Sequence, residues 1–273
     1  MIIRRLLVTL ILASFAALHA HAAWRWLDGW LAICSTVFAA GYLFATWALW
    51  RGYFWARWFV QGIAVVGALN CAALAWLWAA KEVFPATAEI WAIGIQGAAF
   101  VALFALLAGR RMVAHYDRRP SPHNRWELDA GSVRLLRAAL VVNFAALPML
   151  LMYLGSEGHW VTSATRWLTG AALIVLTAAL VLLILQRTAG LLLLGLAGIG
   201  TVWIAIGAAA GIDAMLATSF DGMCGHAVGQ HHLRLMNTAM VASAVFPGAL
   251  AAVAAVVAFA APMFRFLRRP ESR

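Results

Sequence analysis

The sequence has very little charge for its length. Of its 273 residues, 65% are hydrophobic and only 11% are charged. A soluble domain of this size needs far more charged surface, so the composition excludes an ordinary soluble globular protein. Lysine is almost absent, since Lys81 is the only one in the chain. This excludes a phosphate-binding Walker A motif and a lysine Schiff base in the middle of a helix.

Carboxylates and cysteines are also scarce. Only ten residues are Asp or Glu, and none of them lies inside a long apolar stretch. No carboxylate can then relay protons or coordinate sodium in the middle of a membrane, which argues against an ion-coupled pump. The three cysteines, Cys34, Cys71 and Cys224, have neither zinc-finger spacing nor the pattern of a disulfide framework. The motifs of zinc proteases and serine hydrolases are missing as well.

Long apolar stretches dominate the remaining sequence. There are eight of them, and each is long enough to cross about 30 Å of hydrocarbon as a helix of about 20 residues. They cover residues 6–23, 30–50, 58–80, 90–109, 138–156, 167–186, 189–212 and 237–263. Unbroken apolar runs do not fit the alternating pattern of a membrane β-barrel. The sequence therefore predicts an all-α fold, a polytopic helical membrane protein with about eight transmembrane helices.

Positive charge is concentrated on one side of these stretches. With eight spans, sixteen of the 20 basic residues fall on one side. Because basic loops stay in the cytoplasm, both the N- and the C-terminus are expected there. The arginines flank apolar stretches instead of forming one patch, so the net charge of +10 does not indicate nucleic acid. We expect a multi-pass protein of the bacterial inner (plasma) membrane, with the lipid bilayer as its partner.

One long basic loop divides the predicted spans into two groups. Residues 1–109 form a first four-helix transmembrane half, residues 110–137 a basic cytoplasmic loop, and residues 138–273 a second four-helix half. Arginines of this loop are also suited to anionic lipid headgroups.

The N-terminus has two interpretations. Arg4 and Arg5, the apolar run and the A-x-A pattern at residues 20–22 resemble a secretory signal with its cleavage site. Cleavage would leave seven spans. Residues 24–26, with the sequence Trp-Arg-Trp, instead resemble an interfacial anchor, which favours a retained first helix.

Metal-ligand side chains gather on the arginine-poor side. The predicted outward segment between the last two spans combines carboxylate, thioether, thiol and imidazole groups within a few residues. Imidazole suits copper, zinc or iron, and sulfur favours Cu(I). His19 and His21 end the first span on the same side of the membrane. The candidate metal ligands are therefore His226, His231, His232 and Cys224, then His19 and His21, with Met223 and Asp221 as auxiliary ligands.

The spacing of these residues permits a metal site without specifying one. His226 and His231 are five residues apart, which places them about 140° apart on a helix, so they converge only if the chain turns near Gly229. Three alternatives stay open. The histidines are ordinary interfacial polar residues, two of them hold a haem iron, or Cys224 and His226 form a thiolate–imidazole pair.

Two short stretches resemble the CopD family of bacterial inner-membrane copper-resistance proteins, which also have about eight spans. The first is His19-Ala-His21-Ala-Ala-Trp24 with the following Trp26-Leu-Asp-Gly29, where that family tends to have Trp and then Gly-Gly. Here Trp30 replaces the second glycine. The second stretch is Gly225-His226-Ala227. The run from His226 to His231 is also similar to a His/Gln-His element of membrane proteins that assist cytochrome oxidase assembly, with one additional residue. Both resemblances imply periplasmic copper handling.

We therefore expect an inner-membrane protein that binds a transition metal, with copper as the first choice, at a periplasmic-face His/Cys/Met cluster for metal transport or delivery. A periplasmic metal carrier or a larger membrane complex would be its partner. The first alternative is a membrane-embedded enzyme or redox subunit that uses zinc or haem. The second alternative is a structural or assembly subunit of a membrane complex.

Overall fold

The computed structural model describes residues 2–25, 29–81, 87–117, 130–155, 163–185 and 187–222, together with residue 257. Within these residues the secondary structure is helical and no strand occurs, which confirms the predicted all-α class for this part of the chain. The elements are α1 (Ile2–Arg25), α2 (Gly29–Arg51), α3 (Phe54–Lys81), α4 (Thr87–Ala108), α5 (Arg110–Asp117), α6 (Ala130–Gly155), α7 (Ser163–Ile184) and α8 (Ala189–Gly222).

Several of these helices have the length and the composition of membrane spans. Five apolar segments of the described residues are long enough to cross a bilayer: Ile2–Arg25, Ala32–Arg51, Trp91–Ala108, Arg134–Leu151 and Ala164–Ile184. Large apolar side chains remain exposed along their outer faces, among them Leu10, Ile95 and Ile174. Such surfaces are unfavourable in water and suit contact with lipid tails. The architecture is that of a multi-pass membrane protein.

The helix boundaries differ from the predicted spans where charged residues continue a helix. The first residues of the expected 110–137 loop form the short helix α5, and α6 begins at Ala130, eight residues before the expected start of its span. α8 runs to Gly222, ten residues past the expected end at 212. Hydropathy marks the part of a helix that lies in hydrocarbon, whereas backbone hydrogen bonding continues beyond it. The predicted eighth span, 237–263, lies outside the described residues except for residue 257.

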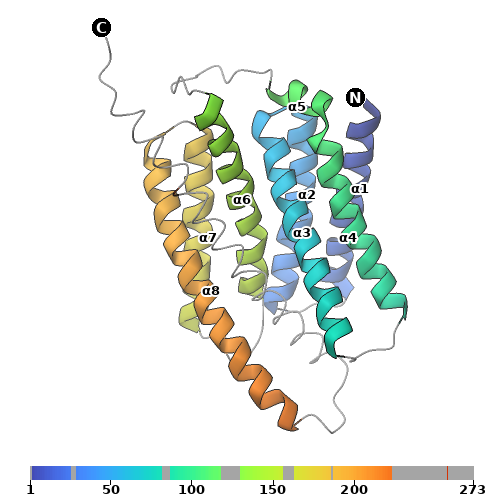
Figure 1. The fold of residues 1–273 in the computed structure, drawn as a ribbon, viewed down its shortest axis with the longest axis vertical. Helices are drawn as coiled ribbons and strands as arrows, with labels where there is room; N and C mark the ends of the chain where they lie inside the picture. Colours follow the sequence, from blue (N-terminus) through green and yellow to red (C-terminus); the bar gives the residue numbers. More distant parts are fainter. Residues whose placement is uncertain are drawn as a thin grey trace.

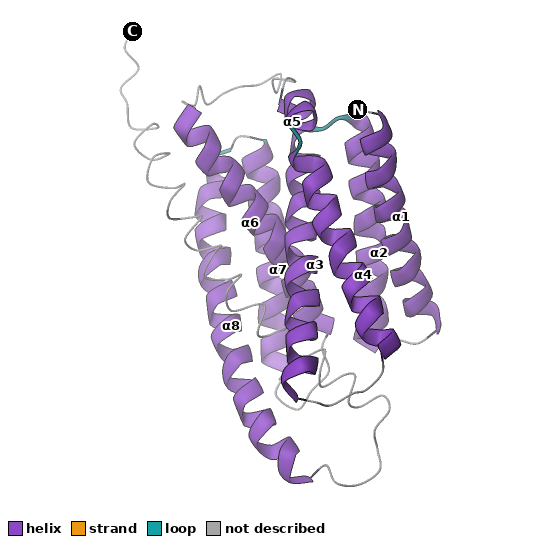
Figure 2. Ribbon diagram, turned by 45° about the vertical axis from the view of Figure 1, so that its right-hand side comes forward, coloured by secondary structure: helices purple, strands orange, loops and turns teal. Residues whose placement is uncertain are grey.

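The long helices run alternately up and down, side by side, and α3 lies between two groups (Figures 1 and 2). α1, α2, α4 and α5 pack on one side of α3, and α6, α7 and α8 lie on the other side. Each group has its own hydrophobic core, and α3 contributes residues to both. Val60 and Ile63 belong to the first core, whereas Trp58 and Val66 belong to the second.

Two glycines let α3 approach its neighbours at very short range. A Cβ atom on Gly62 would lie 2.8 Å from the backbone nitrogen of Ala145 and 2.8 Å from the carbonyl oxygen of Val141, both on α6. A Cβ atom on Gly67 would overlap the ring of Phe100 on α4. Close approach through small residues is a main source of helix association in membranes, where the hydrophobic effect does not drive it. These contacts set the position of α3 between the two cores.

The described basic residues are distributed unevenly between the two ends of the bundle. Nine arginines lie at or near helix ends on the upper side in Figure 1, where α5 also lies. They are Arg4, Arg5, Arg51, Arg57, Arg110, Arg111, Arg134, Arg137 and Arg187. The opposite end has Arg25, Lys81 and Arg166. We refer to these ends as the arginine-rich end and the arginine-poor end.

Substitution of Gly62 by alanine is expected to destabilise the bundle. The added methyl group meets backbone atoms of α6 that cannot move aside, which costs about 1–3 kcal/mol. Gly41→Ala is the matched control, because nothing lies within 4 Å of a Cβ at that position. Thermal unfolding in a neutral detergent measures both. Equal stability of the two variants would contradict the close α3–α6 contact.

Candidate functional site

His19 is half-buried between α1 and α2 near the arginine-poor end of the bundle. Its ring stacks against Phe38 at 5.1 Å between ring centroids and lies 5.6 Å from the ring of Tyr42. Its Nδ1 atom lies 3.4 Å from the hydroxyl oxygen of Ser35, a long hydrogen bond. These contacts hold the imidazole in a defined position within an apolar surface.

The position of His19 follows from the apolar periodicity of α1. The buried residues of this helix are Val8, Leu12, Phe15 and Ala16, and His19 falls four residues after Phe15 on the same face. Phe15 stacks on Phe100 at 4.3 Å and lies 5.6 Å from Tyr42. The helix thus presents a histidine where the pattern calls for another apolar residue. A polar side chain retained in such a place marks a functional candidate.

The Ser35 hydroxyl lies against Nδ1 of His19, so Nε2 is the ring nitrogen that does not face Ser35. If Nδ1 carries the proton and donates it to the Ser35 hydroxyl, Nε2 presents its lone pair for a ligand. Metal-binding histidines are commonly oriented by a hydrogen bond at the other nitrogen in this way. Ser35, Phe38 and Tyr42 lie three and four residues apart, on one face of α2. One helix face therefore supplies both the orienting group and the aromatic walls.

The structure does not bring His21 to the same place. His21 is exposed, whereas His19 faces α2. Two residues along an α-helix are rotated by about 200°, so the two imidazoles leave α1 in different directions. A site built on His19 would need its other ligands from elsewhere in the chain.

The remaining candidate ligands follow the C-terminal end of α8. Asp221 lies in the last turn of that helix, at the arginine-poor end. Met223, Cys224, His226, His231 and His232 lie outside the described residues. Among the side chains that the structure does describe, no group of three His, Cys, Asp or Glu residues could hold a metal ion. Most ligands of the predicted cluster are thus not among the described residues, and the cluster stays a prediction.

The arginine-rich end is held together around the C-terminus of α2. Gly52, with a φ of 73°, closes the helix in the left-handed conformation that favours glycine. The Arg5 side chain of α1 donates hydrogen bonds to the carbonyl oxygens of Leu49 and Trp50, at 2.8 and 2.9 Å, and lies 4.5 Å from the centre of the Trp50 ring. A cation at a helix C-terminus is favourable, because the last carbonyl groups lack partners within the helix.

Tyr116 of α5 completes this network. Its side chain is fully buried, and its hydroxyl donates a hydrogen bond to the Leu49 carbonyl at 2.8 Å. Burial raises the pKa of Tyr116, while the neighbouring Arg5 acts in the opposite direction. The hydroxyl thus stays protonated and keeps its role as a donor. Three helices, α1, α2 and α5, are joined at one carbonyl group.

The partners of His19 and the different contacts of Arg4 and Arg5 were not predicted from the sequence. Ser35 is a polar residue in an apolar run, beside Cys34, and its spacing to Phe38 and Tyr42 was a usable signal. The sequence does not show that Arg4 and Arg5 have different neighbours. The two residues belong to the same turn of α1, and only the directions of their side chains differ.

No family model, curated protein or solved structure matches this chain. The resemblance to the CopD family therefore stays a prediction.

Tyr116→Phe is expected to lower the free energy of unfolding by about 0.5–1.5 kcal/mol, the usual net value of one buried hydrogen bond. Arg5→Ala is expected to cost more, because it removes two charge-assisted hydrogen bonds and the contact with Trp50. Arg4→Ala is the control from the same helical turn and should stay within about 0.5 kcal/mol of the unmodified protein. Thermal unfolding in detergent tests the order, and a larger loss for Arg4→Ala than for Arg5→Ala would contradict the network.

Proposed function

We propose that the chain is an eight-span protein of the bacterial inner membrane with both termini in the cytoplasm. Support comes from the arginine-rich end, because basic residues collect on the cytoplasmic side of membrane proteins. α1 is retained in this proposal, since Val8 and Leu12 belong to the first hydrophobic core and Arg5 caps α2. The arginine-poor end then faces the periplasm.

At that end the protein binds a transition metal, with copper as the preferred ion. The observation that carries this proposal is the half-buried His19, oriented by Ser35 and enclosed by aromatic rings. Imidazole is a common ligand of copper, zinc and iron, and an intramembrane histidine is a functional candidate. Cys224 and Met223 would add the soft sulfur ligands that favour Cu(I). The candidate imidazoles of the same region are His226, His231 and His232, with His21 and Asp221 in support.

The length of α8 supports this location. Its 34 residues extend for about 51 Å, well beyond the ~30 Å of hydrocarbon. In both views α8 slants, and its C-terminal end lies below the lower end of α3 (Figures 1 and 2). The last described residue of α8, Gly222, therefore lies at the arginine-poor end, the same end that contains His19.

The proposed activity is capture of the metal at the periplasmic face and its transport or delivery to a partner, either a periplasmic metal carrier or a larger membrane complex. No step of covalent chemistry is required. The proposed ligands come from α1 and from the separate segment 223–232. Such a ligand set suits transfer of the metal to a partner, because the partner's ligands can replace them one at a time.

Detergent-purified protein, loaded with Cu(I) and dialysed, should retain copper in a fixed ratio to protein by elemental analysis. The double substitution His226→Ala with His231→Ala should abolish retention, and His19→Ala should reduce it at least tenfold in affinity. His115→Gln is the matched control, because His115 lies on α5 at the arginine-rich end. Unchanged copper in the first two variants would refute the site. Zinc or a Soret band in place of copper indicates the enzyme or redox alternative, and a metal-free protein that purifies with a larger complex indicates an assembly subunit.

The proposed orientation predicts that Cys224 reacts from the periplasmic side. In a Cys34→Ala, Cys71→Ala background, an impermeant maleimide should modify Cys224 in intact spheroplasts. For the control, Arg187→Cys in a cysteine-free background places a thiol in the exposed α7–α8 turn at the arginine-rich end, where modification should require lysis. Reaction of Cys224 only after lysis would invert the topology and remove the periplasmic site.

A further inference from the structure

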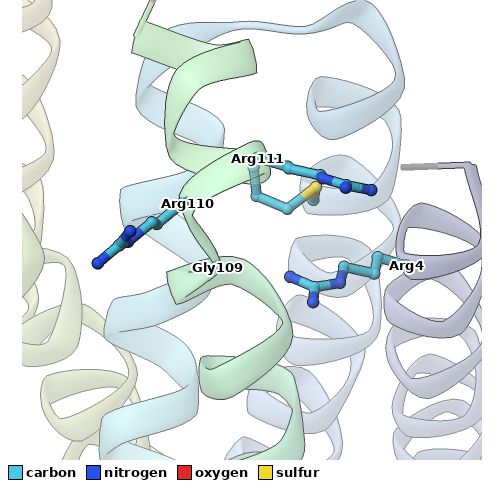
Figure 3. A pocket seen from close by; sticks show the side chains of 5 residues that line it. Arg4, Gly109, Arg110 and Arg111 are labelled. Carbon is cyan, nitrogen blue, oxygen red and sulfur yellow. The ribbon is translucent and has the colours of Figure 1, made fainter.

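A pocket with a volume of about 480 Å³ lies at the arginine-rich end, where the first turn of α1 meets the junction of α4 and α5 (Figure 3). It is lined by Arg4, Gly109, Arg110, Arg111 and Met112. Its volume falls in the range of about 300–1,000 Å³ that is typical of small-molecule sites. Three of the five described lining residues are arginines, and none of these five is acidic.

The backbone at the α4–α5 junction makes room for Arg4. A Cβ atom on Gly109 would collide with the Arg4 guanidinium, so glycine at this position lets that group lie against the main chain. In Figure 3 the side chains of Arg4 and Arg111 extend on one side of the α4–α5 ribbon, one above the other, whereas Arg110 extends to the opposite side. Arg4 and Arg111 are therefore the two lining arginines that extend to the same side of the α4–α5 junction in this view.

Buried residues of α5 hold this helix, and with it Arg111, in a defined position. Met112 and Tyr116, four residues apart, are buried in the first hydrophobic core, while Arg110 and Arg111 are exposed. The buried face of the helix holds its position, so the exposed face presents the two arginines at a defined place.

No described residue of the chain compensates the charges in this pocket. Within the described part of the chain, the guanidinium groups of Arg4, Arg110 and Arg111 make no hydrogen bond or ion pair. Arg5, one residue away, has its positive charge satisfied by the carbonyl oxygens of α2. Like charges held together without a counter-charge repel each other, and an anion that binds between them removes this cost.

The pocket also lies at the depth of lipid headgroups. Two apolar spans, Ile2–Arg25 and Trp91–Ala108, have their ends beside it. The Trp50 ring nitrogen, which donates a hydrogen bond to Thr9 at 2.8 Å, belongs to the same end of the bundle, where amphipathic rings prefer the membrane interface.

From this geometry we propose that the pocket is a binding site for a phosphate group, with Arg4 and Arg111 as its main ligands and Arg110 at its rim. The planar donor groups of arginine match two oxygens of a phosphate at once. The phosphate belongs to an anionic phospholipid of the cytoplasmic leaflet or to a soluble phosphate; the chemistry of recognition is the same. This site is independent of the proposed metal site at the other end of the bundle.

The test uses full-length protein in a neutral detergent, titrated with dihexanoyl phosphatidylglycerol, dihexanoyl phosphatidylcholine and inorganic phosphate, with binding followed by microscale thermophoresis. We expect the anionic lipid to bind at least tenfold more tightly than the zwitterionic lipid. The double substitution Arg4→Gln with Arg111→Gln should weaken its binding at least tenfold. Arg187→Gln is the charge control, because it removes one positive charge from an exposed site at the same end of the bundle, and it should change binding less than twofold.

A second variant separates geometry from charge. Gly109→Val keeps every arginine but fills the space occupied by the Arg4 guanidinium, and it should weaken binding by several fold. If inorganic phosphate binds with similar affinity and competes with the lipid, the site stands and its source is a soluble phosphate. Equal binding of both lipids without phosphate binding, or equal loss in Arg187→Gln, would overturn the proposal.

Discussion

The close packing of α3 against two neighbours is the constraint on which the rest of the bundle depends. Gly62 brings its backbone against α6, and Gly67 brings it against the ring of Phe100 on α4. Since lipid tails are as apolar as leucine, helices in a membrane associate through such close contacts rather than through removal of apolar surface from water. The two hydrophobic cores meet on α3, and α2 of the first group also contacts α6 of the second, so these two contacts together fix the groups relative to each other.

The arginine-rich end shows how one helical turn can serve two purposes. Arg4 and Arg5 are consecutive, yet about 100° of rotation separates them on α1. Arg5 turns toward the end of α2, where it satisfies carbonyl groups that the helix leaves without partners. Arg4 turns toward Gly109 and contributes its charge to a pocket. Removal of charge at these two positions therefore has separate consequences, one for stability and one for the electrostatic potential of the pocket.

Much of the fold was predictable because each apolar stretch long enough to span a bilayer must be helical there. The limits of prediction appear where that constraint ends. α5 and the last ten residues of α8 contain charged and small residues, so hydropathy does not mark them as helical. His19 was recognised as a candidate, but its contact with Ser35 depends on which faces of α1 and α2 meet. Hydropathy carries no such information, and the same is true of the contact between Arg4 and Gly109.

The uneven charge of the bundle bears on the choice between transport and delivery of a metal. A cation that moved from His19 toward the arginine-rich end would approach nine described arginines, of which Arg4, Arg110 and Arg111 have no partner among the described residues. Its potential energy would rise along that path, because unit charges still repel by about 4 kcal/mol at 4 Å with an effective dielectric constant of 20. The apolar spans contain no carboxylate that would compensate this repulsion. The charge distribution therefore favours a metal that binds and leaves at the arginine-poor end, which makes delivery to a partner the better form of the proposed function.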